Sequence, residues 1–191
     1  NGIKVGAYFF SSAVNEAEAI EEADWVADFI SDYSITYPVA FDCEGFNTSE
    51  SRQKSMTKAE RTAVATAFLQ EIYDKGYTPM FYAASSELTN NSQWNTASLE
   101  SSYKIWVAQY PSTPYPETPS TSYAGTCSMW QYTNQGRVAG IGTNVDINVA
   151  YFGYSESNSS LSGETAAAAS PDVEAGMVFT SVTVSYTHLT L

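Results

Sequence analysis

Short apolar runs alternate with segments of helical periodicity through most of the chain. An apolar run bounded by glycine or proline is typical of a buried strand, whereas apolar residues three and four positions apart are typical of a helix. We therefore predict six strands, at Ile3–Phe10, Val39–Phe41, Thr78–Ala83, Tyr103–Tyr110, Cys127–Thr133 and Asn144–Tyr151. Within the first of these, Gly6 suits close approach of a neighbouring backbone.

Two longer segments are predicted to form helices that begin at capping residues. Asn15 is followed three positions later by Glu18, and Thr57 by Glu60, which is the spacing of a capping box. The first helix is expected to direct these residues to a core: Ala19, Ile20, Ala23, Val26, Ala27 and Ile30. The second is expected to bury Ala63, Val64, Ala67, Phe68 and Ile72 and to end at Lys75–Gly76. A weaker helical pattern covers Ser86–Trp94.

The order of these elements predicts an α/β fold. Strands alternate with helices in the first half, and strands follow one another in the second, which indicates a β/α barrel or a doubly wound sheet. Pro111–Gly125 contains four prolines and is predicted to be an irregular loop. A closed barrel of this kind usually has eight strands, so six predicted strands indicate an incomplete barrel.

Composition divides the chain into three parts. Residues 1–153 hold all the predicted elements and are assigned to one domain. Residues 154–176 are rich in Ser, Ala and Glu, which is typical of a linker. Residues 177–191 are β-prone but too short to fold alone, so they either begin a second domain or are unrelated to the native protein.

Two carboxylates at the end of the second predicted strand are the first candidates for chemistry. Residues two apart on a strand share a face and lie roughly 6.6 Å apart, so Asp42 and Glu44 project together while Cys43 points the opposite way. The carboxyl ends of strands are where α/β folds place their active sites. Paired carboxylates there suggest glycoside hydrolysis. The alternative is solvated charge, or a pair that accepts hydrogen bonds from the next loop.

Charge and residue counts exclude several other chemistries. The net charge is −13 with only 8 basic residues, which argues against nucleic acid or an anionic membrane as a partner. The one histidine, His188, lies in the last few residues, so neither a Ser-His-Asp site nor a histidine zinc site is expected. Cys43 and Cys127 either form one bridge or remain packed thiols. No cofactor or metal is predicted, and carboxylates and tyrosines remain as the acid–base groups.

With the strands in place, the chain resembles glycoside hydrolase family 25, the Chalaropsis-type lysozymes. The similarity covers residues 2–153, and no single motif is as specific as the ordered set. The matching pieces are V-G-A-Y-F-F (Val5–Phe10), P-V-A-F-D-C-E (Pro38–Glu44), P-M-F-Y (Pro79–Tyr82), I-W-V-A-Q-Y (Ile105–Tyr110), M-W-Q-Y-T (Met129–Thr133) and V-A-G-I-G-T-N-V-D-I-N (Val138–Asn148).

This resemblance implies an irregular, TIM-like β/α barrel and a muramidase. Such an enzyme cleaves the β-1,4 bond between N-acetylmuramic acid and N-acetylglucosamine in peptidoglycan, outside the cell or at its wall, and we expect a monomer. Glu44 matches the family's proton donor. Asp42 matches the carboxylate that assists the substrate's own N-acetyl group, and Asp146 matches a further carboxylate on the last strand. The alternative for Asp146 is a structural cap of the neighbouring loop.

Aromatic residues near strand ends are candidates for sugar binding, since aromatic rings stack on the apolar faces of pyranoses. Core packing is the alternative for each of them. Two match positions at the mouth of the family's barrel, Tyr82 and Trp106. The other candidates are Tyr8, Phe10, Tyr110 and Trp130.

The sequence departs from the family at its N-terminal end. The family's barrel begins with a strand that carries another active-site Asp, followed by a helix and a second strand, and this sequence contains none of them. We therefore expect six of eight strands and a partial catalytic domain. Two other functions remain open: a non-catalytic peptidoglycan-binding module, and a glycosidase that acts on another N-acetylated glycan such as chitin.

Overall fold

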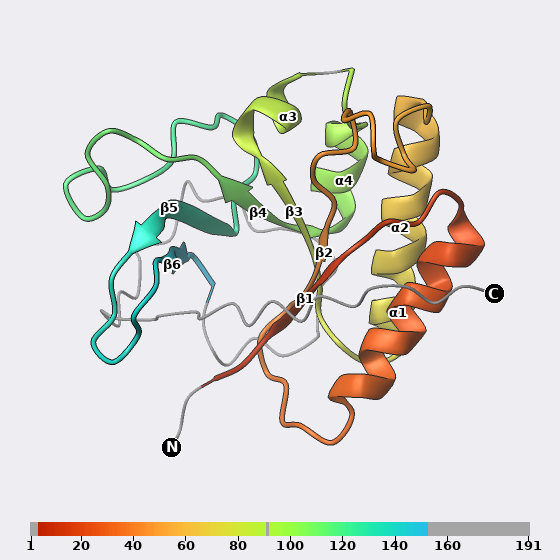
Figure 1. The fold of residues 1–191 in the computed structure, drawn as a ribbon, viewed down its shortest axis with the longest axis horizontal. Coiled ribbons are helices and arrows are strands. Elements are labelled where there is room, and N and C mark those ends of the chain that lie inside the picture. Colours follow the sequence, from red (N-terminus) through yellow and green to blue (C-terminus); the bar gives the residue numbers. More distant parts are fainter. Residues whose placement is uncertain (1–3, 91, 153–191) are drawn as a thin grey trace.

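The computed structural model describes residues 4–90 and 92–152, and it contains six strands and four helices within them (Figure 1). The predicted linker at 154–176 and the tail at 177–191 lie outside the described residues. In chain order the elements are β1 (Ala7–Phe10), α1 (Glu16–Ile30), β2 (Val39–Asp42), α2 (Lys58–Asp74), β3 (Pro79–Ala84), α3 (Ser85–Thr89), α4 (Thr96–Ser102), β4 (Lys104–Ala108), β5 (Met129–Gly136) and β6 (Val145–Ala150).

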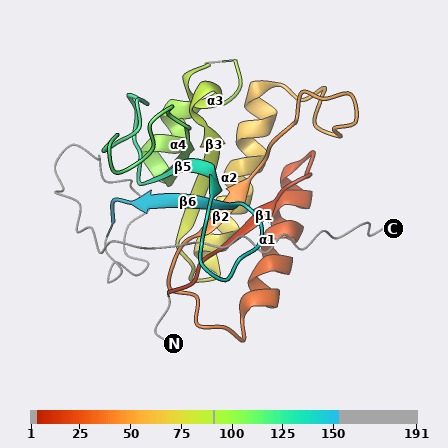
Figure 2. The same cartoon turned by 60° about the vertical axis from the view of Figure 1, so that its left-hand side comes forward.

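The strands form one sheet in the order β1-β2-β3-β4-β5-β6. The first five strands run parallel, and β6 is antiparallel to β5. The sheet curls, so that in Figure 2 β5 and β6 run steeply across the direction of β1 and β2. This is the predicted α/β half-barrel with six strands. In the described part of the chain β1 and β6 each pair with a single strand, so these strands do not close a barrel.

Side chains on the two faces of the sheet form two separate apolar clusters. On one face, α1 and α2 pack on residues such as Val39, Phe41 and Ile105 to make the main core. On the other face, the concave side of the curl, Ala40, Met80, Met129 and Tyr37 make a smaller cluster. The four residues of β2 are all buried, as expected for a strand covered on both faces.

Both predicted helix starts are confirmed. The Asn15 side chain accepts from the Glu18 amide at 2.9 Å, and Thr57 with Glu60 forms the full capping box. The prediction that Ile20 faces the core is wrong, since Ile20 is 39% exposed. Helix α1 packs through a narrow stripe that includes Ala19, Ala23 and Val26. Those side chains are small, so the surface that α1 buries is narrow and Ile20 lies outside it.

The region after β3 differs from the prediction of one weak helix. It contains two short helices, α3 and α4, and Trp94 lies between them with 0% exposure. Its ring packs edge-on against Phe46 and Phe81, with centroids 5.5 and 4.9 Å away. The buried Trp94 ring therefore holds the segment between α3 and α4 against the core. Helical periodicity in the sequence does not predict this packing.

Residues 111–125 form an irregular loop, as predicted. Cys43 and Cys127 are both free and buried, which settles the choice between a bridge and packed thiols. Among the described residues no helix is long and apolar enough to cross a membrane.

Substitution of Gly6 tests the close approach predicted for it. A Cβ there would lie 2.6 Å from the Pro38 carbonyl oxygen and 2.9 Å from the Tyr37 Cβ, so Gly6→Ala forces β1 away from the segment before β2. We expect the free energy of unfolding to fall by about 1–3 kcal/mol, as in other overpacked sites.

Gly142→Ala is the matched control, because nothing lies within 4 Å of the position that its added methyl group would take. Its unfolding free energy should stay within about 0.5 kcal/mol of the parent in urea titrations. Equal effects of the two substitutions would contradict the close packing at Gly6.

Candidate active site

The end of β2 separates its side chains as the alternation predicts. Asp42 lies on the concave face and is 8% exposed. The Cys43 thiol points into the helix-side core, where it donates to Gln53 Oε1 at 3.0 Å. Glu44 lies just beyond the strand and is exposed, and Gly45 follows it with a φ of +64°, which turns the chain away.

Asp42 is the carboxyl whose acidity the structure changes most clearly. Burial, then the charge of Glu44 and a side-chain hydrogen bond with Glu44, raise the pKa of Asp42 to about 8. The charges of Glu87 and Asp146 act in the same direction. At neutral pH Asp42 therefore keeps its proton.

Asp146 and Glu87 bring further acidic groups to the same end of the sheet. Asp146 lies half-buried on β6, where burial raises its pKa, and its charge also helps to raise the pKa of Tyr110. Glu87 lies on α3, directly after β3, and burial followed by the charge of Glu44 raises its pKa. In addition to burial, the charges of carboxyls on α3 and β6 thus raise the pKa of Asp42 on β2, at the mouth of the half-barrel.

Sequence analysis missed Glu87. The signal for it was its position three residues after a strand that runs parallel to β2, because neighbouring parallel strands bring their carboxyl ends to one edge. The helical pattern predicted over 86–94 obscured that position.

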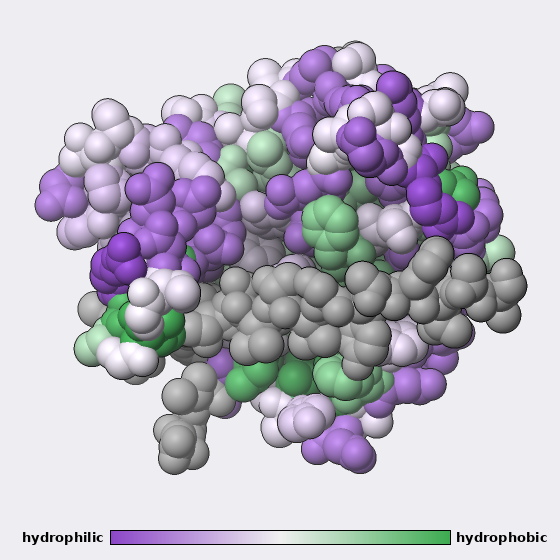
Figure 3. Space-filling model, in the orientation of Figure 1, coloured by the Kyte–Doolittle hydropathy of each residue, from purple (hydrophilic) through white to green (hydrophobic). Residues whose placement is uncertain are grey.

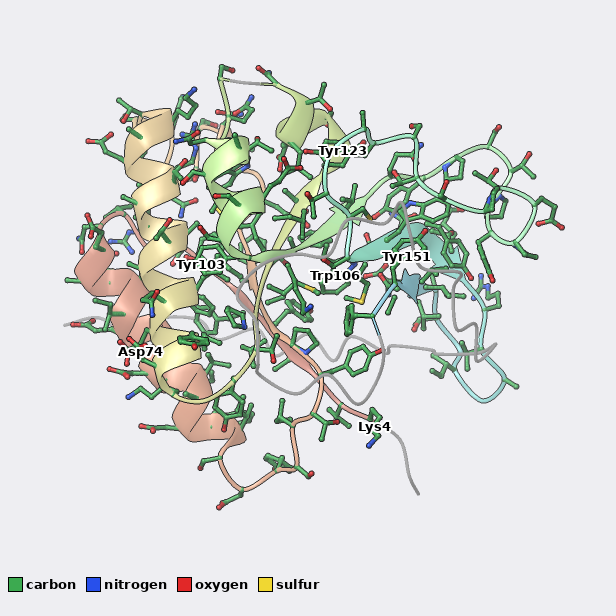
Figure 4. The ribbon with its side chains drawn as sticks, turned by 180° about the vertical axis from the view of Figure 1, so that it is seen from behind. Lys4, Asp74, Tyr103, Trp106, Tyr123 and Tyr151 are labelled. Carbon is green, nitrogen blue, oxygen red and sulfur yellow. The ribbon has the colours of Figure 1, made fainter. Side chains whose placement is uncertain are left out.

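Two of the predicted aromatic residues form a connected row with Asp42. In the sheet register Asp42 pairs with Tyr82 and Tyr82 pairs with Trp106, so the three side chains lie on the concave face. The Tyr82 and Trp106 rings meet edge-to-face with centroids 4.9 Å apart. Figure 4 shows Trp106 pointing toward the middle of the molecule, whereas Tyr103 on the same segment lies beside α2.

Hydrogen bonds extend this row to β5 and β6. The Tyr82 hydroxyl donates to Gln131 Oε1 at 3.0 Å, and the Tyr110 hydroxyl donates to the same oxygen. The Trp106 indole donates to Asn148 Oδ1 at 2.8 Å. Neither Gln131 nor Asn148 was predicted as a site residue. Both are buried polar groups on the concave face, a feature that the sequence does not distinguish from an outward position.

The remaining aromatic candidates differ in their exposure and in their depth within the half-barrel. Phe10 and Tyr110 are 57% and 47% exposed at the same end of the sheet as Asp42. Tyr8 is half-buried one layer deeper, against the smaller cluster.

Trp130 does not join the aromatic row. It is 0% exposed in the helix-side core, and its indole donates to the Gln109 carbonyl oxygen at 2.7 Å. Its neighbour Met129 takes the concave position on β5, so the alternation of that strand turns Trp130 away from any ligand in the half-barrel.

Within residues 4–90 and 92–152, no group of three or more His, Cys, Asp or Glu side chains is placed to hold a metal ion. After burial, the charges of Glu44, Glu87 and Asp146 each raise the pKa of Asp42. Their arrangement suits acid–base chemistry on a ligand that enters from the carboxyl ends of the strands.

The raised pKa of Asp42 predicts a pH-dependent stability. Because the pKa rises from 3.8 to about 8 on folding, Asp42 lowers the free energy of unfolding progressively between those pH values. Asp42→Asn removes this penalty. We expect the Asp42→Asn variant to be about 2–5 kcal/mol more stable than the parent at pH 8, and equally stable near pH 4.

Urea unfolding at a series of pH values measures this difference. Asp28→Asn, on the exposed face of α1, controls for the loss of one negative charge from a chain of net charge −13. If the free energies of unfolding of the two variants depend on pH in the same way, Asp42 is not a protonated, buried carboxyl at neutral pH.

Comparison with known proteins gives a family for this chain. Residues 1–141 match glycosyl hydrolases family 25. No curated protein sequence matches the chain. The catalytic domain of endolysin ply40 from bacteriophage P40 of Listeria monocytogenes has a similar structure, with a TM-score of 0.60, 20% identity, and coverage of 78% of this chain and 68% of that one.

Two other solved structures show the same fold. The bacterial lysozyme from Streptomyces coelicolor has a TM-score of 0.54 and 21% identity, over 78% of this chain and 68% of that one. The modular autolysin LytC from Streptococcus pneumoniae, solved with a synthetic peptidoglycan ligand, has a TM-score of 0.54 and 23% identity, over 77% of this chain and 34% of that one.

The chain spans only part of its relatives, 46% and 49% of two further solved chains with this fold. The family match covers most of the 191 residues and includes β2 with Asp42 and Glu44. On this evidence the chain belongs to glycosyl hydrolase family 25.

Proposed function

We propose that this protein hydrolyses peptidoglycan as a muramidase, cleaving the β-1,4 bond between N-acetylmuramic acid and N-acetylglucosamine. The observation that supports this most is the Asp42–Glu44 pair at the carboxyl end of β2, in a chain of family 25. The peptidoglycan ligand of LytC supports the substrate class. The protein would act at the cell wall, on glycan strands, and as a monomer.

Glu44 is placed to act as the general acid. It is the exposed member of the pair, so its carboxyl is able to meet a glycosidic oxygen, whereas Asp42 lies deeper on the concave face. Below about pH 8 Asp42 carries the proton that the reaction needs. Proton transfer from a positioned carboxyl to the leaving oxygen accelerates such reactions by about 10²–10⁴-fold.

Asp42 assists the substrate in this proposal. When the acetamido N–H of the sugar donates a hydrogen bond to Asp42, that bond favours the carboxylate form. The proton then resides on Glu44, where the leaving oxygen receives it. The acetamido oxygen attacks the anomeric carbon as the glycosidic bond breaks, and a water molecule, deprotonated by Glu44, later opens the cyclic intermediate. Asp146 and Glu87 keep the site negative as positive charge develops on the sugar.

The aromatic residues supply the sugar-binding surface. Tyr82 and Trp106 form its floor beside Asp42, and Phe10 and Tyr110 are exposed at its rim. Such rings stack on pyranose faces without needing charge. A neutral glycan also avoids repulsion by the net charge of −13. On the face shown in Figure 3, hydrophilic residues predominate and apolar residues form small separate patches.

Glu44→Gln tests the general acid. This variant keeps the shape of the side chain but cannot donate the acid proton, so release of reducing ends from purified peptidoglycan should fall by about 10²–10⁴-fold. Pelleting with insoluble wall should remain within about twofold of the parent, since the aromatic surface is intact. Glu21→Gln, on the exposed side of α1, is the control and should behave as the parent.

The other functions give distinct results in the same assay. Unchanged turnover in Glu44→Gln removes Glu44 from the mechanism. Wall binding without any release by the parent chain supports a non-catalytic binding module. Faster release from chitin than from peptidoglycan supports a glycosidase for another N-acetylated glycan.

A further inference from the structure

We propose that Asn148, on β6, binds the substrate by donating a hydrogen bond from Nδ2 to the carbonyl oxygen of a sugar acetamido group. Asn148 is 6% exposed, and within residues 4–90 and 92–152 its Nδ2 has no hydrogen-bond partner. A buried amide donor that lacks an acceptor costs free energy, so native structures rarely keep one without a reason.

Trp106 fixes which end of the Asn148 amide is free. An indole N–H is only a donor, so it must face the amide oxygen, and the observed Nε1–Oδ1 distance is 2.8 Å. The alternative amide orientation would place two donors against each other. The Asn148 nitrogen is therefore held on the side away from the indole, and Trp106 cannot satisfy it.

The surroundings of Asn148 belong to the proposed sugar site. Asn148 pairs in register with Gln131, whose Oε1 accepts from the Tyr82 and Tyr110 hydroxyls. Trp106, its hydrogen-bond partner, lies edge-on to Tyr82 on the concave face. Asn148 and Asp146 are two residues apart on β6 and share a face, because side chains alternate along a strand.

Within the described part of the chain, Asp42 is a second buried polar residue on the concave face with an unpaired atom. Its Oδ1 is also buried without a partner among the described residues, so one unmet acceptor and one unmet donor remain on the same concave surface. Asp42 lies on β2 and Asn148 on β6, and the Tyr82–Trp106 pair occupies the first two of the three strands between them. The acetamido group that donates to Asp42 uses its oxygen as the nucleophile in the proposed mechanism, so the acetamido oxygen that meets Asn148 belongs to another sugar of the same glycan strand.

A sugar hydroxyl does not match this arrangement as well. A hydroxyl oxygen is bonded directly to the ring carbon, whereas the acetamido oxygen lies two atoms further out, so a hydroxyl does not reach a donor that is placed for the acetamido oxygen. The site should consequently discriminate between an acetamido group and a hydroxyl at the same position of the ring. A site whose polar groups require a ligand group rejects ligands that lack it.

This inference rests on the proposed function for its choice of ligand, so the experiment measures binding and not turnover. The full chain is titrated with tri-N-acetylchitotriose and with cellotriose, a neutral trimer with hydroxyls in place of the acetamido groups, and dissociation constants are taken from NMR shift changes. We expect the parent to prefer the acetylated trimer. Asn148→Leu, nearly the same size, should reduce that preference about 5- to 10-fold while leaving cellotriose binding unchanged.

Trp106→Phe is the matched comparison, because it removes the indole donor but leaves the Asn148 amide. If Asn148 served only to hold Trp106, both variants would weaken the two trimers alike, and the inference would be overturned. A parent that binds both trimers equally would also overturn it. Asn148→Ser replaces Asn148→Leu if the melting temperature of the latter falls. If the parent chain does not hydrolyse cell wall but still prefers the acetylated trimer, the muramidase proposal alone is refuted. Asn148 would then remain an acetamido-binding residue.

Discussion

A carboxyl group buried at the end of a strand is the constraint on which this site depends. Asp42 is 8% exposed, and a buried carboxylate without a cationic partner is strongly disfavoured. No lysine or arginine forms an ion pair with Asp42 among the described residues. The group stays inside because it keeps a proton, with its pKa raised to about 8 by burial and by the neighbouring Glu44. The protein is therefore less stable near neutral pH, but it holds a proton beside the proposed sugar site.

The loop that carries Glu44 is held by packing two residues further along the chain. Phe46 is 1% exposed, and the Arg61 guanidinium lies 4.5 Å from its ring centroid. Arg61 also donates to the Met56 and Gln93 carbonyl oxygens, at 2.7 and 3.2 Å. A single buried arginine on α2 therefore ties the segment after β2 to the segment before α4. Glu44 is exposed, but the chain on which it lies is anchored on its C-terminal side.

Sequence patterns were sufficient for the sheet and for the position of its first two acids. The apolar run of β2 and the alternation of Asp42, Cys43 and Glu44 correctly placed one carboxyl on the concave face and the thiol in the core. The N-cap residues located α1 and α2, since caps act through neighbouring residues alone.

The rest depended on contacts between distant segments. Trp130 and Trp106 look alike in sequence, yet only the register of β4 and β5 shows that they occupy opposite faces. Glu87 and Asn148 gain their importance from what surrounds them, namely Glu44 in one case and Trp106 in the other. Local periodicity cannot supply such pairings.

The two free, buried thiols can be used to measure local opening of the fold. Burial raises the pKa of Cys43 and of Cys127 to about 12, so neither forms the reactive thiolate at neutral pH in the closed protein. Alkylating reagents therefore modify each sulfur only when its own segment detaches, Cys43 at the end of β2 and Cys127 just before β5. The relative labelling rates of these two positions would show whether the Asp42–Glu44 end of β2 opens independently of the far side of the sheet.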